Sequence, residues 1–201
     1  FDQGGMLREY VKWDYELRAG QPVEVVVRRA LDIAMSEPRG PVYLTLPREL
    51  LGDAAVPGSG ELRPRPPGAI PAVPDAAAIA RAAEWIRGAR LPLIITASSG
   101  RRPENVQLLS DLALRFGIAV ADPGEPGARD VNIPSAHPMY LGKYPRDELG
   151  RADVIVVLDS EVPWWPAVAP PHPDARLIHI APDPFYSRYP HRGFAMDLAI
   201  A

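Results

Sequence analysis

The chain contains no cysteine among its 201 residues, so it can form neither disulfide bonds nor thiolate metal sites. It also lacks a long apolar run. The longest runs, such as Val154 to Leu158, have the length of a buried strand, whereas a membrane-spanning helix needs ~20 apolar residues. The first residues carry neither an initiator methionine nor the basic and apolar segments of a signal peptide. We therefore expect the chain to begin inside a longer protein.

Neither sign of charge dominates the sequence. Lys and Arg number 22 and Asp and Glu number 25, which gives a net charge of −3. A surface for nucleic acid or for an anionic membrane needs clustered positive charge, so we expect neither partner. The absence of cysteine is compatible with a reducing compartment, and we expect a cytoplasmic location.

Proline, by contrast, is abundant: it accounts for 25 of the 201 residues, about twice its usual share of ~5%. The densest proline stretch, residues 56–74, has neither helical nor strand periodicity. Because proline fixes its own φ and restricts the preceding residue, we expect this stretch to be a partly extended linker. It separates residues 1–55 from residues 75–201, which we interpret as parts of two different domains.

The first part predicts one helix and one strand. Apolar residues recur at helical spacing at Val23, Val26, Val27, Ala30, Leu31 and Ala34. The segment from Pro41 to Pro47 is typical of a strand, and the stretch Leu7 to Leu17 is either another helix or an irregular segment. One strand cannot make a sheet by itself. We therefore expect residues 1–55 to be the end of a domain whose beginning lies upstream.

The second part predicts alternating helices and strands. We expect helices at 75–88, 103–117 and 145–151, and strands at 91–96, 118–121, 153–158, 176–180 and 198–201. The inward-facing helix residues should be Ile79, Ala82, Ala83, Ile86, Val106, Leu109, Leu112, Ala113 and Phe116. Strands that are apolar on both faces and alternate with helices are typical of a parallel sheet. The expected fold is therefore α/β, a doubly wound, Rossmann-like parallel sheet.

A ligand of such a sheet should bind at the carboxyl ends of the strands. This edge should include Ser98 to Arg101, Asp122 to Gly124, Asp159 to Trp165 and Pro182 to Phe185. Backbone N–H groups in the Ser-Ser-Gly turn are suited to holding a phosphate. The candidate cofactor-binding residues are therefore Ser98, Ser99, Gly100 and Asp183, although the chain has no G-x-G-x-x-G motif. The alternative is a crevice without a ligand.

Other residues have structural as well as functional interpretations. Trp164 and Trp165 are candidates for a ligand-stacking or partner surface, or for packing on the prolines of their own loop or on absent domains. The four histidines lack metal-ligand spacing, and we predict no metal site. Asp147-Glu148 is most simply explained by the dipole of a short helix, and Lys12 by an exposed or interface position. We predict no catalytic residue in the chain.

Several segments, taken in order, resemble the thiamine-diphosphate enzymes of the acetolactate synthase type. Ser36 to Pro47 is similar to the family's "P-x-G-P-V" helix–strand segment at the end of its first domain, and Tyr10 to Trp13 to the segment before it. His137 to Gly142 is similar to its "H-P-x-x-x-G" loop, and Ala152 to Val157 to its "A-D-x" strand. The resemblance implies residues 1–55 from the pyrimidine-binding domain, residues 56–74 as linker, and residues 75–201 as the Rossmann-like central domain.

The family's cofactor-binding motifs are not in this sequence. The resemblance places the activating glutamate before Phe1 and the Mg²⁺-binding "G-D-G…N" motif after Ala201. It implies a lyase or transferase acting on a 2-oxo acid by decarboxylation or carboligation, with thiamine diphosphate and magnesium in the parent protein and neither in this fragment. The implied partners are the missing N- and C-terminal domains and further copies of the same chain.

Two other functions remain open from the sequence. One is a nucleotide-binding module that uses the crevice for FAD, NAD or ADP; the resemblance implies FAD or an ADP-containing group there in some family members. The other is a structural or interaction domain anchored by Trp164 and Trp165.

Overall fold

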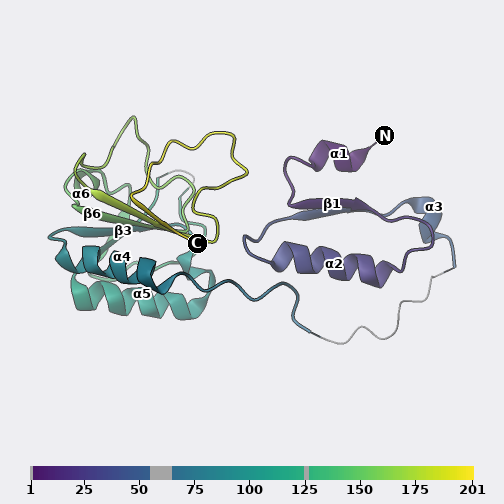
Figure 1. Ribbon diagram of the computed structural model, residues 1–201, viewed down its shortest axis with the longest axis horizontal. Coiled ribbons are helices and arrows are strands. Elements are labelled where there is room, and N and C mark those ends of the chain that lie inside the picture. Colours follow the sequence, from purple (N-terminus) through teal and green to yellow (C-terminus); the bar gives the residue numbers. More distant parts are fainter. Residues whose placement is uncertain (1, 55–64, 125–126) are drawn as a thin grey trace. The chain divides into compact units, whose positions relative to one another are not determined.

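The computed structural model describes residues 2–54, 65–124 and 127–201, and the chain forms two compact units (Figure 1). The first unit comprises Phe1–Ala72 and the second Val73–Ala201. Part of the predicted linker, residues 56–64, lies outside the described residues. None of the helices in the described ranges is long and apolar enough to cross a membrane.

The first unit is built around a two-stranded parallel sheet. Its elements are α1 (Gln3–Leu7), β1 (Trp13–Glu16), α2 (Val23–Met35), β2 (Val42–Thr45) and α3 (Arg48–Leu51). Strands β1 and β2 pair in parallel from Trp13 with Val42 to Glu16 with Thr45. The expectation of a helix or irregular segment throughout Leu7 to Leu17, and of a single strand, is therefore wrong.

The aromatic residues of β1 show why this segment is a strand. Trp13 and Tyr15 alternate with polar residues, and their rings stack at 5.3 Å between centroids. Side chains two residues apart share one face of a strand. The guanidinium of Arg29, on α2, lies 5.6 Å from the Trp13 ring centroid, so α2 contacts this aromatic face.

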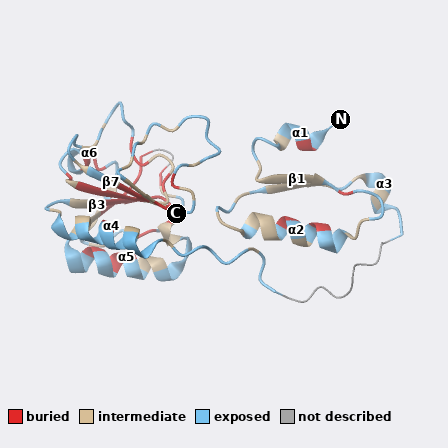
Figure 2. Ribbon diagram, in the orientation of Figure 1, coloured by how far each residue is buried: buried red, intermediate tan, exposed pale blue. Residues whose placement is uncertain are grey.

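Helix α2 buries only a narrow part of its predicted apolar stripe. Val26 and Ala30 are buried, whereas Val23, Val27 and Leu31 are 37–46% exposed. A two-stranded sheet offers too small a surface to cover a wider stripe. The first unit therefore carries an uncovered apolar helix face (Figure 2).

The described part of the linker is attached to α2 through Asp32. Both carboxylate oxygens of Asp32 accept hydrogen bonds from Arg65, at 3.2 and 2.6 Å, and the backbone N–H of Gly68 donates to one of them at 3.1 Å. The next residue, Ala69, donates its N–H to the hydroxyl of Ser36. Residues 65–69 are therefore fixed on the first unit.

The second unit contains a six-stranded sheet in which all pairings are parallel. Its strands are β3 (Pro92–Thr96), β4 (Ala119–Asp122), β5 (Tyr140–Lys143), β6 (Val154–Leu158), β7 (Arg176–Ile180) and β8 (Leu198–Ile200). Their spatial order is β5-β4-β3-β6-β7-β8. The chain moves outward from β3 to β5 and then returns to the other side of β3, so the switch point lies between β3 and β6. The α/β parallel-sheet prediction is confirmed, and β5 is an additional strand within an expected loop.

The two faces of this sheet are covered differently (Figure 1). Helices α4 (Ala76–Gly88) and α5 (Pro103–Phe116) pack on one face over Ile94, Val156 and Ile178. The other face, with Ile95 and Ile155, is covered by the short α6 (Arg146–Leu149) and by the loops that contain Trp164 and Phe194. Proline- and tryptophan-rich loops thus take the place of helices on the second face.

The ends of the covering helices follow the sequence, but their buried faces are narrower than predicted. The Asp75 carboxylate caps α4 by accepting from the Ala78 N–H at 2.8 Å. Ala82, Leu109 and Ala113 are buried as expected, whereas Ile79, Ala83, Leu112 and Phe116 are exposed. The prediction for these four is wrong. Each helix contacts the sheet through a narrow stripe, which contains Ala82 on α4 and Leu109 and Ala113 on α5.

Replacing Asp32 by Ala should release residues 65–69 from α2. The substitution removes the acceptor for Arg65 and for the Gly68 N–H. We expect faster amide exchange at Gly68 and faster proteolysis near Arg65, with little change in the second unit. Hydrogen exchange measured by mass spectrometry tests this. Asp53→Ala, at an exposed position of the same unit, is the control. Unchanged exchange at Gly68 in the Asp32 variant would contradict the assignment.

Candidate functional site

The carboxyl ends of β3 and β6 meet at the switch point, where a doubly wound sheet binds its ligands. The short helix η1 (Ser99–Arg101) follows β3, and Asp159 follows β6. The Arg101 guanidinium and the Asp159 carboxylate form an ion pair directly across the switch point. A second ion pair, between Arg129 and Glu161, lies over the same edge. The crevice is therefore bridged by side chains of the chain itself.

The predicted phosphate-binding turn is already occupied by a side chain. The Asn132 carboxamide oxygen accepts hydrogen bonds from the Gly100 N–H at 2.9 Å and from the Ser99 hydroxyl at 3.1 Å. Its amide nitrogen donates to the Thr96 carbonyl at 3.1 Å. Asn132 is 2% exposed. It therefore takes the place that a ligand oxygen would take at this turn.

Gly100 is required by the close approach of the segment that carries Asn132. A Cβ atom at Gly100 would lie 1.9 Å from the Val131 carbonyl oxygen, which no packing allows. The same segment is anchored to β3 because the Arg129 and Asp130 N–H groups donate to the Ala97 carbonyl at 2.8 and 3.3 Å. Glycine is therefore needed at position 100 because the backbone of Val131 packs directly against it.

Asp183, the fourth predicted site residue, stabilises its own turn. Its carboxylate accepts hydrogen bonds from the Ser187 N–H and hydroxyl, both at 2.8 Å. Burial opposes ionisation, but these bonds hold the pKa of Asp183 below its ordinary value. The structure brings Ser98, Ser99 and Gly100 together after β3 and places Asp183 after β7. Their role in cofactor binding stays a prediction.

A buried polar cluster lies beneath the loop that follows β7. The His179 side chain is fully buried, and its ring stacks with that of Tyr186 at 5.9 Å between centroids. An Arg192 guanidinium nitrogen lies 3.4 Å from His179 Nδ1, and the guanidinium carbon Cζ lies 5.0 Å from the Tyr186 ring centroid and 5.1 Å from that of Phe194. Burial and the positive charge of Arg192 lower the pKa of His179 to about 4. His179 is therefore neutral at pH 7.

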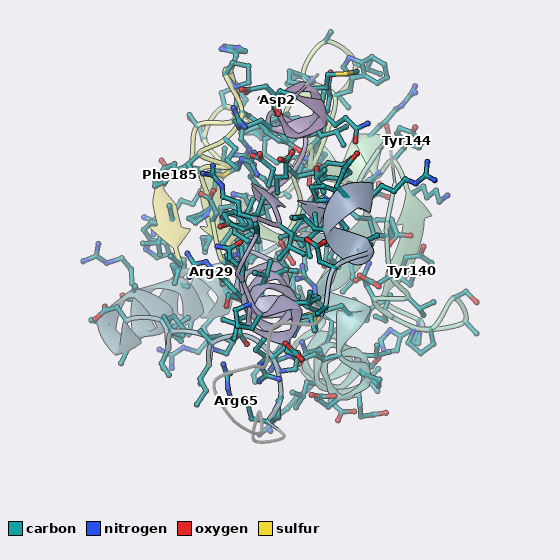
Figure 3. All side chains as sticks on the ribbon, turned by 90° about the vertical axis from the view of Figure 1, so that its right-hand side faces the viewer. Asp2, Arg29, Arg65, Tyr140, Tyr144 and Phe185 are labelled. Atoms are coloured by element: carbon teal, nitrogen blue, oxygen red, sulfur yellow. The ribbon has the colours of Figure 1, made fainter. Side chains whose placement is uncertain are left out.

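A second polar pair joins β4 and β5. The Tyr140 hydroxyl donates to the Asp122 carboxylate at 2.6 Å. Burial and this hydrogen bond raise the pKa of Tyr140 to about 12. Tyr140 begins β5 and Tyr144 follows its end, so both lie along the edge strand (Figure 3). Tyr140 is therefore a neutral donor and not a base at pH 7.

The remaining candidates have separate positions. Trp164 is 7% exposed and packs in the core, whereas Trp165 is 55% exposed. Lys12 donates from Nζ to the carbonyls of Ile33 and Ser36 at 2.8 and 2.7 Å, at the end of α2. Asp147 and Glu148 lie in the single turn of α6. In the ranges that the structure covers, no three His, Cys, Asp or Glu side chains form a group able to hold a metal ion.

Sequence reasoning missed Asn132, which organises the crevice. It sits between Val131 and Ile133 in a proline- and glycine-rich stretch, and nothing in that local pattern distinguishes it from a turn asparagine. Its role depends on contacts with residues more than 30 positions away.

Comparisons with known proteins give one consistent result. No protein-family model matches the chain. The chain is 27% identical over 194 residues to benzoylformate decarboxylase from Pseudomonas aeruginosa, covering 91% of this chain and 36% of that protein. The chain therefore spans little more than a third of the length of that relative.

Solved structures show the same correspondence. Benzoylformate decarboxylase from Polynucleobacter necessarius matches all of this chain and 38% of its own, with a TM-score of 0.81 and 23% identity. A Mycobacterium smegmatis protein, described as a thiamin diphosphate-dependent enzyme, matches 99% of this chain and 38% of its own chain. Its TM-score is 0.72 and its sequence identity is 26%. A Rhodococcus jostii 4-hydroxybenzoylformate decarboxylase matches 90% of this chain and 36% of its own chain, with a TM-score of 0.71 and 20% identity. The expected resemblance to thiamine-diphosphate enzymes is confirmed.

Replacing Asn132 by Ala should destabilise the second unit. The change leaves the Gly100 N–H, the Ser99 hydroxyl and the Thr96 carbonyl without their shared partner. We expect the free energy of unfolding to fall by about 2–4 kcal/mol, measured by urea denaturation. Gln107→Ala, which removes an amide from the exposed side of α5, should change it by less than about 0.5 kcal/mol. Equal effects of the two substitutions would refute the role of Asn132.

His179 should make the second unit sensitive to acid. Because its folded pKa of about 4 lies below the ordinary value of 6.5, the unfolded chain binds the proton more tightly. Stability should therefore fall between pH 6.5 and pH 4, by about 2–4 kcal/mol from this group. Urea denaturation at both pH values should give a smaller loss for His179→Gln. The loss should be unchanged for His172→Gln, where the side chain is half exposed.

Proposed function

We propose that this chain is part of a thiamine-diphosphate-dependent 2-oxo acid decarboxylase, and that it joins the end of the pyrimidine-binding domain to the central domain. The observation that carries the proposal is the alignment of 91% of the chain with a benzoylformate decarboxylase, together with a structural match over the whole chain. Benzoylformate is an aryl-substituted 2-oxo acid. Loss of its carboxyl group as CO₂ leaves benzaldehyde.

The proposed domains are residues 1–55, the linker 56–74 and residues 75–201. In support, the chain divides into compact units between Ala72 and Val73, close to the end of the proline-rich stretch. The exposed apolar side chains on α2 also support it. A helix face of this kind is normally covered by the rest of a sheet.

Cofactor binding and catalysis belong to other parts of the proposed enzyme. Thiamine diphosphate stabilises the carbanion that forms when a 2-oxo acid loses CO₂. The residues present here do not fit a magnesium–diphosphate site, because the sequence contains no Gly-Asp-Gly and the described residues form no acidic ligand group. This chain would supply a rigid central sheet, a linker and surfaces for the flanking domains. A magnesium ion, a cytoplasmic location and a homo-oligomer are parts of the same proposal.

A carboligase of the acetolactate synthase type is the second candidate. It is favoured by the segment from Ser36 to Pro47 and its order relative to His137 to Gly142. The two reactions differ in their products. A decarboxylase releases an aldehyde from one 2-oxo acid, whereas a carboligase joins the remaining fragment to a second carbonyl compound.

Calorimetric titration tests the division of roles. Thiamine diphosphate with Mg²⁺ should show no saturable binding to the 201 residues, and saturable binding to the longer protein with its flanking sequence. The longer protein should release CO₂ from benzoylformate and form benzaldehyde. Tight cofactor binding by the 201 residues alone would overturn the proposed roles. Acetolactate formed from pyruvate, without aldehyde from benzoylformate, would favour the carboligase.

A further inference from the structure

A pocket of about 170 Å³ opens in the second unit beside the ends of β4 and β5, on the face covered by α6. Aromatic rings line it on several sides, from Tyr144, Trp164 and Trp165. Leu149 and Val168 add aliphatic surface. None of the residues of the two ion pairs at the switch point lines the pocket, and neither does the turn at Ser98 to Gly100. The pocket therefore belongs to the carboxyl edge of the sheet but is distinct from the turn that Asn132 fills.

The inner wall of the pocket is fixed by packing. Trp164 is 7% exposed, and its ring meets the Phe194 ring edge-on at 5.4 Å between centroids. Leu149 is 1% exposed. The Trp165 carbonyl accepts hydrogen bonds from the Val168 and Ala169 N–H groups, both at 2.9 Å, which closes a helical turn at the mouth. The concave shape thus exists without a ligand, as is usual for small-molecule pockets.

The outer wall depends on a strained residue and a glycine. Tyr144 has φ +57°, a left-handed conformation that bulky side chains rarely adopt. Such conformations cluster at ligand-binding positions, where the surrounding structure holds them. A Cβ atom on Gly124 would lie 2.9 Å from the Tyr144 ring. The ring can therefore keep its position against the pocket only while residue 124 has no side chain.

Size and charge together indicate the class of ligand. An apolar cavity of roughly 150 Å³ accepts one benzene ring. Arg146 is the only charged residue that lines the pocket, and in the described part of the chain its side chain has no carboxylate partner. Asp147 and Glu148 follow it on α6 but do not line the pocket. A planar guanidinium beside aromatic walls matches a planar carboxylate attached to a ring.

We propose that this pocket binds an aromatic monocarboxylate. The ring would lie among Tyr144, Trp164 and Trp165, with the carboxylate paired to Arg146 at the rim. All of these residues belong to the second unit, so binding requires neither thiamine diphosphate nor the flanking domains. The proposal is independent of the proposed catalytic function and stands or falls separately from it.

Titration of benzoate into the 201-residue protein tests the proposal. Binding is followed by tryptophan fluorescence and by ligand-observed NMR, with benzyl alcohol and acetate as matched probes that lack the charge or the ring. We expect saturable benzoate binding, affinity at least about fivefold weaker for benzyl alcohol, and none for acetate. Absence of saturable benzoate binding to the folded protein would overturn the proposal, as would equal binding of acetate.

Substitutions locate the binding site. Trp165→Ala, at an exposed position, should weaken benzoate binding about tenfold or more, because a ring-stacking surface is lost. Arg146→Gln should abolish the preference for benzoate over benzyl alcohol, and Gly124→Ala should weaken both probes by displacing the Tyr144 ring. Arg87→Gln, an exposed arginine at the end of α4, is the matched control and should leave both affinities unchanged. Unchanged affinities in all three pocket variants would place benzoate elsewhere and refute the site.

Discussion

The second unit depends on one packing constraint: strands β3 and β6 are apolar on both faces and must be covered on both. Ile94 and Ile95 point to opposite faces of the sheet, and each is at most 2% exposed. Burying such a side chain stabilises a fold by about 1.5–3 kcal/mol. Helices α4 and α5 cover only one face. The long loops after β6 and β7 must therefore contribute core residues, and this accounts for buried Trp164 and for Phe194 beside it.

Covering a sheet face with loops has consequences for the carboxyl edge. A helix pairs most of its backbone N–H and C=O groups internally, whereas a loop does not. Buried loop backbone groups therefore need side-chain partners. Arg192 serves this need by donating to the Ser160 and Glu161 carbonyls at 3.4 and 3.3 Å, and Asp183 by accepting from Ser187. Asp183, which the sequence predicts as a binding-site residue, thus stabilises a loop through its hydrogen bonds. The aromatic pocket is lined by the loop after β6, by α6 and by residues that follow β4 and β5.

The relation to thiamine-diphosphate decarboxylases gives these features a context. Those relatives are about two and a half times as long as this chain, and the matching region includes both compact units. In the proposed enzyme, a central sheet whose crevice is closed by Asn132 and by ion pairs would act as a rigid support. The linker segment fixed by Asp32 would hold the preceding domain end in place.

The sequence by itself determined the class of fold and most element positions. Helical spacing, the caps at Asp75 and Gly117, and strands apolar on both faces are local patterns, and local sterics and hydrogen bonding decide them. The order of the family-like segments also indicated the thiamine-diphosphate enzymes, and the comparisons confirm that resemblance. The tertiary structure alone decided that Trp13 to Glu16 pairs as a strand, which helix residues are buried, and that Asn132 fills the turn at Gly100. These features depend on contacts between residues distant in the chain, and no local pattern encodes which distant group will lie opposite.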